Sequence, residues 1–176
     1  GPLVAFDMAM EAGDVALAEG FGKGWGDVSL KPARALRLAR VARLLGKGED
    51  ADRLSKIAVE QGTVVPSALV ERVLVLCGLG KATDALALLG RYSLLAPEEQ
   101  PWLKAYGTAQ SGKTADAKKQ VEALKEPDKK APWPVRRDAL LAMAAVNDKR
   151  AKPWLKDLQK ERPNDPDVLG VAKTLK

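Results

Sequence analysis

The feature that most constrains the fold is a short turn that returns about every 34 residues. Each copy follows an apolar stretch with helical spacing, and four of the five place an alanine five residues after a glycine. Glycine, and after it asparagine, best adopts the left-handed conformation that ends a helix. A period of this length indicates a repeated helix-turn-helix unit. The turns are centred on Gly13, Gly46, Gly80, Gly112 and Asn147, with spacings of 33, 34, 32 and 35 residues.

Prolines repeat with the same period. They fall 16 to 21 residues after each turn, where proline fits the first turn of the next helix or the break before it. They are Pro32, Pro66, Pro97 or Pro101, Pro132, and Pro163 or Pro166. First helices are therefore expected over 3–12, 32–45, 66–79, 97–111 and 134–146, and second helices over 14–23, 49–61, 82–95, 114–125 and 151–161. A last helix is expected over 165–175, and because no stretch alternates like a strand, the predicted fold is all-α.

The unit, as in LGKATDALALLGRYSLLAP from Leu79 to Pro97, resembles the tetratricopeptide repeat (TPR) family over essentially the full chain. The resemblance implies a single right-handed α-solenoid over residues 1–176. Its repeats would be 1–30, 31–64, 65–96, 97–131 and 132–164, followed by a terminal helix over 165–176. The chain departs from the family pattern at Arg72 and Lys104, which replace apolar residues, at Lys152, which replaces an alanine, and at Trp102 and Tyr106, which are out of register.

One segment suggests a different chemistry. GTAQSGKT, from Gly107 to Thr114, matches the P-loop pattern of nucleotide-binding enzymes at every fixed position. A P-loop follows a buried strand, whereas PEEQPWLKAY before this segment reads as a helix begun by proline. The Gly-Lys pair also recurs in the turns at Gly46 and Gly80. We therefore predict that GTAQSGKT forms a repeat turn.

A second segment, GFGKGWG over Gly20–Gly26, has glycine at every other position. Each glycine costs roughly 1 kcal/mol relative to alanine in a helix, so we expect a short or frayed second helix in the first repeat. The alternative is a mobile loop on which Phe21 and Trp25 contact a partner.

The family resemblance also implies where a partner binds. First helices line the concave face of such arrays, at positions about ten, six and three before each turn. The residues selected as contacts are Leu36, Arg40, Arg43, Val70, Leu74, Trp102, Tyr106, Arg137 and Leu141. Such a groove would take a protein or peptide segment with apolar anchors and an acidic group. Alternatively these side chains close the interior, an alternative favoured for Leu74 and Leu141 and evenly balanced for Arg40, Arg43, Trp102 and Tyr106.

Composition limits catalysis. The chain has no histidine and one cysteine, Cys77, which lies in an apolar run and is expected to be a packed thiol. No pair of carboxylates, such as Glu98 and Glu99, stands at a recognisable catalytic loop; these two fit a first helical turn. We expect no cofactor, no metal and no enzymatic activity, and interpret the chain as a protein-interaction scaffold.

Charge is uneven along the chain. Residues 1–88 carry 11 basic and 11 acidic side chains, and residues 89–176 carry 18 and 12, which gives the net charge of +6. The basic clusters at 118–119, 129–130, 136–137 and 149–152 have no interleaved aromatic residues, so nucleic-acid binding is not the favoured function. A basic surface for nucleic acid or an acidic partner, and a regulatory domain of an enzyme, stay open as alternatives.

The surroundings of the chain are less constrained. No segment reaches the 18 or so apolar residues that a membrane span needs, and the compartment is not indicated. The leading Gly1-Pro2 is typical of a protease-cleaved tag, so we expect a piece of a larger protein whose end repeat could self-associate.

Overall fold

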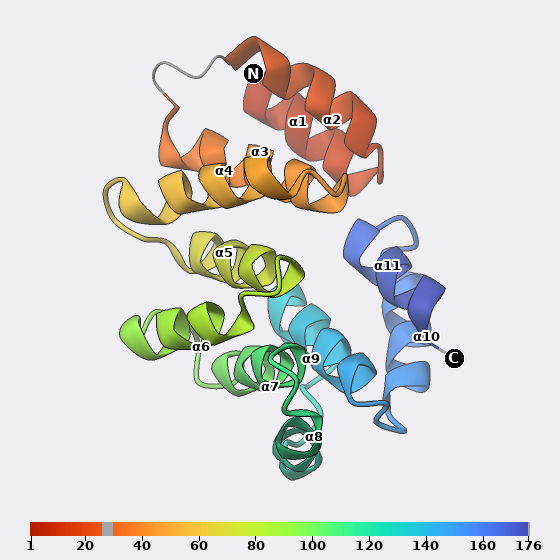
Figure 1. Ribbon diagram of the computed structural model, residues 1–176. Coiled ribbons are helices and arrows are strands. Elements are labelled where there is room, and N and C mark those ends of the chain that lie inside the picture. Colours follow the sequence, from red (N-terminus) through yellow and green to blue (C-terminus); the bar gives the residue numbers. More distant parts are fainter. Residues whose placement is uncertain (26–29, 176) are drawn as a thin grey trace. The chain divides into compact units, whose positions relative to one another are not determined.

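The computed structural model describes residues 1–25 and 30–175 (Figure 1). In these ranges the chain forms eleven α-helices and one short 3₁₀ helix, without a strand, which confirms the all-α prediction. The chain divides into two compact units, Gly1–Leu79 and Gly80–Lys176, and each is described by itself. The single solenoid over residues 1–176 stays a prediction.

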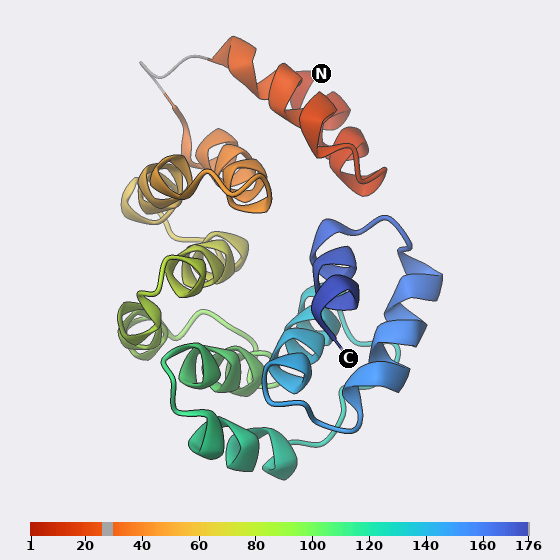
Figure 2. The same ribbon diagram turned by 45° about the vertical axis from the view of Figure 1, so that its right-hand side comes forward.

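The first unit consists of two helical hairpins and a fifth helix (Figure 2). Its elements are α1 (Pro2–Glu11), α2 (Val15–Gly22), the 3₁₀ helix (Lys23–Trp25), α3 (Pro32–Leu44), α4 (Gly48–Glu60) and α5 (Pro66–Gly78). Helix α3 contacts α2, α4 and α5, so the first helices of two successive repeats lie side by side.

The second unit follows the same plan. Its elements are α6 (Ala82–Arg91), α7 (Gln100–Gln110), α8 (Thr114–Ala123), α9 (Trp133–Ala145), α10 (Ala151–Glu161) and α11 (Pro166–Thr174). Helix α7 packs against α6, α8 and α9, and α11 lies against α9 and α10. The largest differences from the expected bounds are at α6, which ends four residues early, and α7, which begins three residues late.

The repeat turns have the predicted backbone conformation. The φ angle is positive at Gly13 (77°), Gly46 (72°), Gly80 (74°), Gly112 (88°) and Asn147 (52°), and Asn147 is the one non-glycine residue with positive φ in the described chain. After the turns at Gly13, Gly46, Gly112 and Asn147, the next residue donates its N–H to a carbonyl five residues back. These bonds are Asp14 to Ala9 (2.9 Å), Lys47 to Ala42 (2.8 Å), Lys113 to Thr108 (3.3 Å) and Asp148 to Met143 (2.9 Å). This bond closes a Schellman motif, so the same helix stop recurs along the chain.

The prolines also lie where the sequence predicts. Helices α1, α3, α5, α7, α9 and α11 each have proline at one of their first two positions. Proline has no N–H to donate, and the N–H groups of the first turn have no partner within the helix, so proline starts these helices at little cost.

Replacing Gly112 with alanine tests the left-handed turn. An alanine at φ 88° is strained by about 1–2 kcal/mol, so the variant should unfold at lower urea concentration. Gly90 is a matched control because it lies inside α6, with open space where a Cβ would stand. Gly90→Ala should instead raise the free energy of unfolding by about 0.5–1 kcal/mol. Urea unfolding of both variants is monitored by circular dichroism. Equal changes in the free energy of unfolding for Gly112→Ala and Gly90→Ala would contradict this account.

One buried cluster of the first unit lies at the α1–α2 hairpin. Phe6, Ala9, Met10 and Ala18 are buried together with Val41 of α3. Gly22 allows this approach, because a Cβ there would stand 2.3 Å from the Leu38 side chain. Small residues on α2 therefore let α3 pack closely.

The GFGKGWG segment is helical over the part that the structure describes. Helix α2 runs through Gly22 and continues as the 3₁₀ helix to Trp25, while Gly26 lies outside the described residues. Trp25 packs on Phe6 with ring centroids 5.2 Å apart, and Arg34 lies over its ring. Of the two aromatics proposed for a binding loop, Phe21 is exposed, whereas Trp25 is half-buried.

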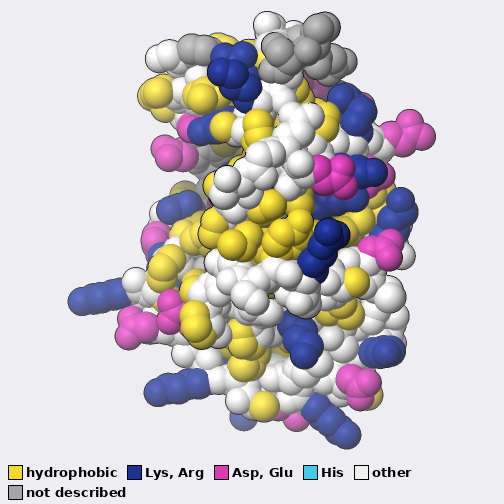
Figure 3. Space-filling model, turned by 90° about the vertical axis from the view of Figure 1, so that its left-hand side faces the viewer, with side chains coloured by type: hydrophobic (Ala, Val, Ile, Leu, Met, Phe, Trp, Pro, Cys, Tyr) yellow, Lys and Arg dark blue, Asp and Glu magenta, His cyan; other side chains and the backbone are white. Residues whose placement is uncertain are grey.

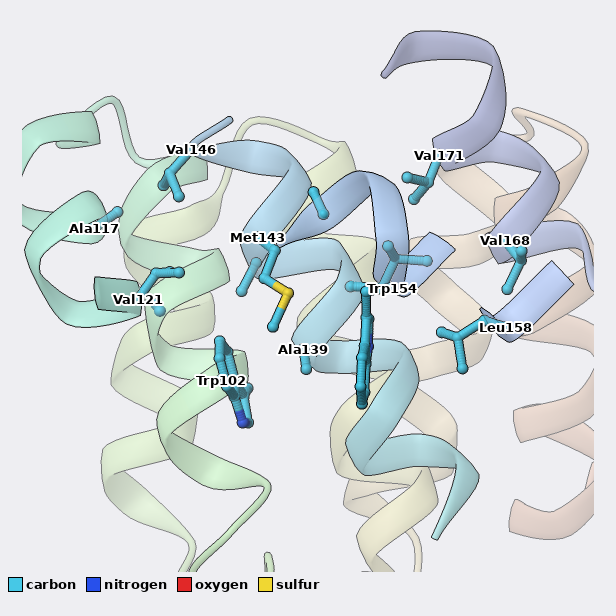
Figure 4. Packing of buried hydrophobic residues seen from close by; sticks show 14 of the residues in the cluster. Trp102, Ala117, Val121, Ala139, Met143, Val146, Trp154, Leu158, Val168 and Val171 are labelled. Atoms are coloured by element: carbon cyan, nitrogen blue, oxygen red, sulfur yellow. The ribbon is translucent and has the colours of Figure 1, made fainter. Parts of the chain in front are cut away.

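In the second unit, one buried cluster joins α7, α8, α9, α10 and α11. Figure 4 shows Ala139 and Met143 of α9 between Trp102 of α7 and Trp154 of α10. Val168 and Val171 of α11 belong to the same buried cluster, so α11 covers the end of this core. Leu158 of α10 is buried in this cluster as well.

Candidate functional site

GTAQSGKT is a helix end and a turn, as predicted. Gly107 and Gln110 lie in α7, and Thr114 is the first residue of α8. The N–H groups of Ser111, Gly112 and Lys113 donate to carbonyls of α7 at 3.0, 3.1 and 3.3 Å. A P-loop binds phosphate through N–H groups of this kind, and here they are already bonded. The segment therefore stops a helix and has no phosphate-binding geometry.

Five of the nine predicted contact residues lie in the first unit, on two helices that pack together. Leu36, Arg40 and Arg43 belong to α3, and Val70 and Leu74 belong to α5. Val70 and Leu74 are buried, whereas the three α3 residues are half-buried. Within this unit, α3 therefore supplies the predicted contacts that still reach solvent.

The arginines of α3 hold carboxylates from neighbouring helices. Arg37 binds Asp7 of α1 through two bonds of 2.8 and 2.9 Å, and Arg43 binds Glu71 of α5 at 2.6 and 3.3 Å. The fork of the guanidinium suits both oxygens of a carboxylate, and such bonds are the strongest that these side chains make. Arg43 was predicted to grip a carboxylate of a partner, and the carboxylate it holds in the structure is Glu71, which is itself buried. Sequence reasoning did not find Asp7 or Glu71 as partners, because each stands about 30 residues from its arginine.

The other four predicted contacts lie in the second unit, where most belong to the core. Trp102 is 2% exposed, and Tyr106 and Leu141 pack against the same buried cluster. Arg137 is buried and donates to its neighbour Asp138. Trp102 and Arg137 thus lie in the interior, and Tyr106 and Leu141 lie at its edge.

The basic clusters of the second unit contain structural arginines. Arg150 donates to the carbonyls of Leu124 (2.7 Å) and Val121 (2.8 Å) at the end of α8, binds Asp148, and lies over the Trp102 ring. Arg136 binds Glu161 of α10 and the Ala131 carbonyl. The sequence pattern identifies both residues only as parts of charged clusters, because their partners on other helices stand about 25 residues away.

The lysines of these clusters are different. Lys118, Lys119, Lys129, Lys130, Lys149 and Lys152 are all exposed. Lys and Arg side chains are dispersed among acidic and apolar ones on the face shown in Figure 3. Trp102, Trp133 and Trp154 are buried, so none of them offers a base-stacking platform beside the lysines.

The structure contains a buried pair of carboxyl groups that the sequence did not reveal. Asp138 of α9 is fully buried, and Glu99, the N-cap residue of α7, is nearly so. Burial raises the pKa of Asp138 well above its ordinary value; nearby Arg137 opposes this shift, and a hydrogen bond with the Glu99 side chain adds to it. Asp138 Oδ2 and Glu99 Oε1 receive no N–H donor in the described chain, so a proton kept on the Asp138 carboxyl supplies the donor that this pair otherwise lacks.

Glu99 therefore differs from its expected role. The sequence placed it in the exposed first turn of a helix, but α7 begins at Gln100 and Glu99 turns inward. Its partner Asp138 lies in the middle of α9, among residues that are otherwise mainly apolar. A carboxylate in an apolar helix face was the one signal in the sequence that could have found this pair.

The Asp138 carboxyl predicts how stability depends on pH. Its pKa in the folded state lies above its ordinary value of 3.8, so the folded protein keeps a proton that the unfolded chain has lost. The stability that this proton contributes is fully present at pH values below the pKa of Asp138 in the unfolded chain. It is lost as the pH rises through the pKa of Asp138 in the folded protein. Asp138→Asn keeps a donor towards Glu99 at every pH. The variant should be more stable than the wild type at neutral pH, with a shallower dependence on pH.

Urea unfolding at several pH values between about 4 and 7 measures this effect. Asp157→Asn, on the exposed side of α10, is the matched control and should keep the slope of the wild type. Parallel curves for Asp138→Asn and the wild type would show that Asp138 is ionised in the folded protein.

Two further searches of the structure bear on chemistry. The described residues contain no group of three or more Asp, Glu, Cys or His side chains placed to hold a metal ion. None of the described helices has the length and apolar character to cross a membrane. Burial raises the pKa of the Cys77 thiol to about 11, so the thiolate that would act as a nucleophile is scarce at neutral pH.

Comparisons with protein-family models, with curated proteins and with solved structures found no match to this chain.

Proposed function

We propose that this chain is a non-catalytic TPR-like scaffold that binds an acidic protein segment on the surface of α3. The observation that carries the proposal is that the same left-handed turn ends a helix about every 34 residues. Repeated helical hairpins of this kind stack, and stacked hairpins expose long faces suited to binding extended partners. A right-handed solenoid of about five such repeats is the architecture that this period favours.

The chemistry of α3 supports an acidic ligand. This helix carries four arginines and no acidic residue, and two of the arginines already hold carboxylates in the forked geometry. Leu36 and Arg40, both half-buried, lie one helical turn apart on this helix. We infer that an apolar side chain of the partner rests on Leu36 while a carboxylate meets Arg40.

Site-specific photo-crosslinking tests the proposal directly. A benzophenone side chain introduced at Leu36 should crosslink one or a few proteins in the source organism, and Arg40→Glu should abolish those crosslinks because it reverses the charge that the ligand meets. The same group at Leu169, an exposed apolar position of α11, is the matched control. Identical crosslinked species from both positions, or no effect of Arg40→Glu, would overturn the assignment to α3.

The exposed lysines of the second unit support the alternative of a basic surface that binds nucleic acid or an acidic partner less well. Lys and Arg side chains are dispersed among other types on the face in Figure 3, and three tryptophans are buried, which leaves little besides charge to bind nucleic acid. A regulatory role beside an enzyme domain is compatible with the same α3 surface.

A further inference from the structure

We propose that the outer surface of the α1–α2 hairpin binds a basic amphipathic helix. This surface is separate from the α3 surface and has the opposite charge preference. It is defined by two apolar pairs, each spaced one helical turn apart. The pairs are Val4 and Met8 on α1, and Leu17 and Phe21 on α2.

The four side chains are unusually exposed for their type. Val4 is 59% and Met8 65% exposed, and Leu17 and Phe21 are 50% and 40% exposed. They are half of the large apolar side chains recorded as exposed in the described chain, although α1 and α2 together are short. Exposed apolar side chains that recur at helical spacing are more typical of an interaction surface than single exposed residues are.

The internal repeat shows that a helical neighbour covers the equivalent positions elsewhere. Val4 and Met8 stand nine and five residues before their turn, as Arg37 and Val41 of α3 do. Arg37 binds α1, and Val41 is buried in the cluster formed by the α1–α2 hairpin. Positions that face the preceding hairpin in α3 thus face solvent in α1. A helix of a partner would pack on this face of α1 in the way that the α1–α2 hairpin packs on α3.

Charge identifies the kind of helix. From residue 1 to residue 22 the chain has four acidic side chains and no lysine or arginine, in a protein whose net charge is +6. Asp7 and Glu19 are bound by Arg37 and Lys47 of the same unit. Glu11 and Asp14 are exposed and take part in no ion pair of the described residues, which leaves negative charge beside the apolar pairs. A partner with lysine or arginine beside its apolar stripe complements this surface.

The first unit contains a precedent for such a complex. Helix α3 is itself basic and amphipathic, with Ala35, Ala39 and Val41 buried and four arginines around them. It packs against the inner side of this same hairpin and binds Asp7 there. A second copy of the chain is the less suitable occupant, because face-to-face pairing of two such hairpins brings acidic surfaces together.

A defined peptide tests the proposal. The probe is a fluorescein-labelled peptide of lysine, leucine and alanine, about 18 residues long, with leucines at helical spacing. Its counterpart has glutamate in place of every lysine. Fluorescence anisotropy should show that the full chain binds the basic peptide, and that added salt weakens the complex. Because the whole chain is positively charged, non-specific attraction would favour the acidic peptide instead.

Variants locate the binding surface. Met8→Gln and Leu17→Gln should each weaken binding of the basic peptide about tenfold, because each removes one apolar anchor. Glu11→Gln should weaken it about two- to threefold and reduce the salt dependence. Leu169→Gln changes another exposed leucine, on α11, and should leave the affinity unchanged. Circular dichroism of each variant establishes that its helices are intact.

Three results would overturn the proposal. They are no measurable binding of the basic peptide, equal losses in Met8→Gln and Leu169→Gln, and sedimentation of the wild type as a dimer that Met8→Gln dissociates. The last result would make a second copy the occupant. Arg40→Glu should leave binding of the basic peptide in place, so failure of the α3 proposal is distinguishable from failure of this one.

Discussion

Trp102→Ala should lower the free energy of unfolding of the second unit by about 3–5 kcal/mol. The Trp102 side chain is almost completely buried in the cluster that joins α7, α9 and α10, and its removal leaves a cavity that these helices cannot close. Urea unfolding followed by circular dichroism measures the loss. Trp133 and Trp154 report the same transition by fluorescence.

Two control variants separate packing from partner binding. Trp102→Phe keeps most of the apolar volume and should cost roughly 1–2 kcal/mol. Lys104→Ala, on the exposed side of α7, should change stability by less than about 0.5 kcal/mol. A stable Trp102→Ala protein that has lost only its ability to bind a partner would restore Trp102 to the predicted groove.

Arg150→Met should lower the free energy of unfolding of the same unit by roughly 2–4 kcal/mol. Arg150 is the only residue of the described chain that is recorded as donating side-chain bonds to the last carbonyls of α8. The Val121 carbonyl also accepts from the Leu124 N–H, whereas the Leu124 carbonyl lies beyond the last turn of the helix, and the positive guanidinium also suits the negative end of the helix dipole. Methionine fills the space over Trp102 but removes the guanidinium donors to the Leu124 carbonyl and to Asp148, which keeps only the backbone N–H of residue 150.

The measurement is again urea unfolding, with two comparisons. Arg150→Lys keeps the positive charge but has no fork to reach both carbonyls, so it should lose part of the same stability. Lys149→Met changes an exposed neighbour and should have little effect. If Arg150→Met is as stable as Lys149→Met, the bonds from Arg150 to α8 contribute nothing to folding.

The sequence predicts the local structure well because the repeated signals are local. The left-handed turns at Gly46, Gly112 and Asn147 each depend on the preference of one residue, and prolines start helices for a reason equally confined to a few atoms. These two signals explain why most helix bounds agree within a few residues. They also explain why GTAQSGKT could be assigned to a turn before its hydrogen bonds were known.

The candidate site depends on contacts between distant residues, and there the sequence is a weaker guide. Arg43 and Arg150 look alike in the sequence, but one binds a glutamate 28 residues away and the other binds helix carbonyls. Trp102 and Leu36 each stand ten residues before a turn, so the sequence pattern treats them as equivalent. In the structure, however, Trp102 is buried and Leu36 is half-buried. Only the packing of neighbouring helices decides which arginine or aromatic side chain remains free for a partner.

The solitary thiol gives this chain a built-in reporter of its own fluctuations. Cys77 is buried in α5 and its thiolate form is scarce, so a maleimide or disulfide reagent can reach it only when the structure around α5 opens. The rate of modification in native buffer therefore measures that opening, without unfolding the bulk of the sample. Since the chain has no other cysteine, a thiol added at any exposed position can be labelled selectively while Cys77 stays protected.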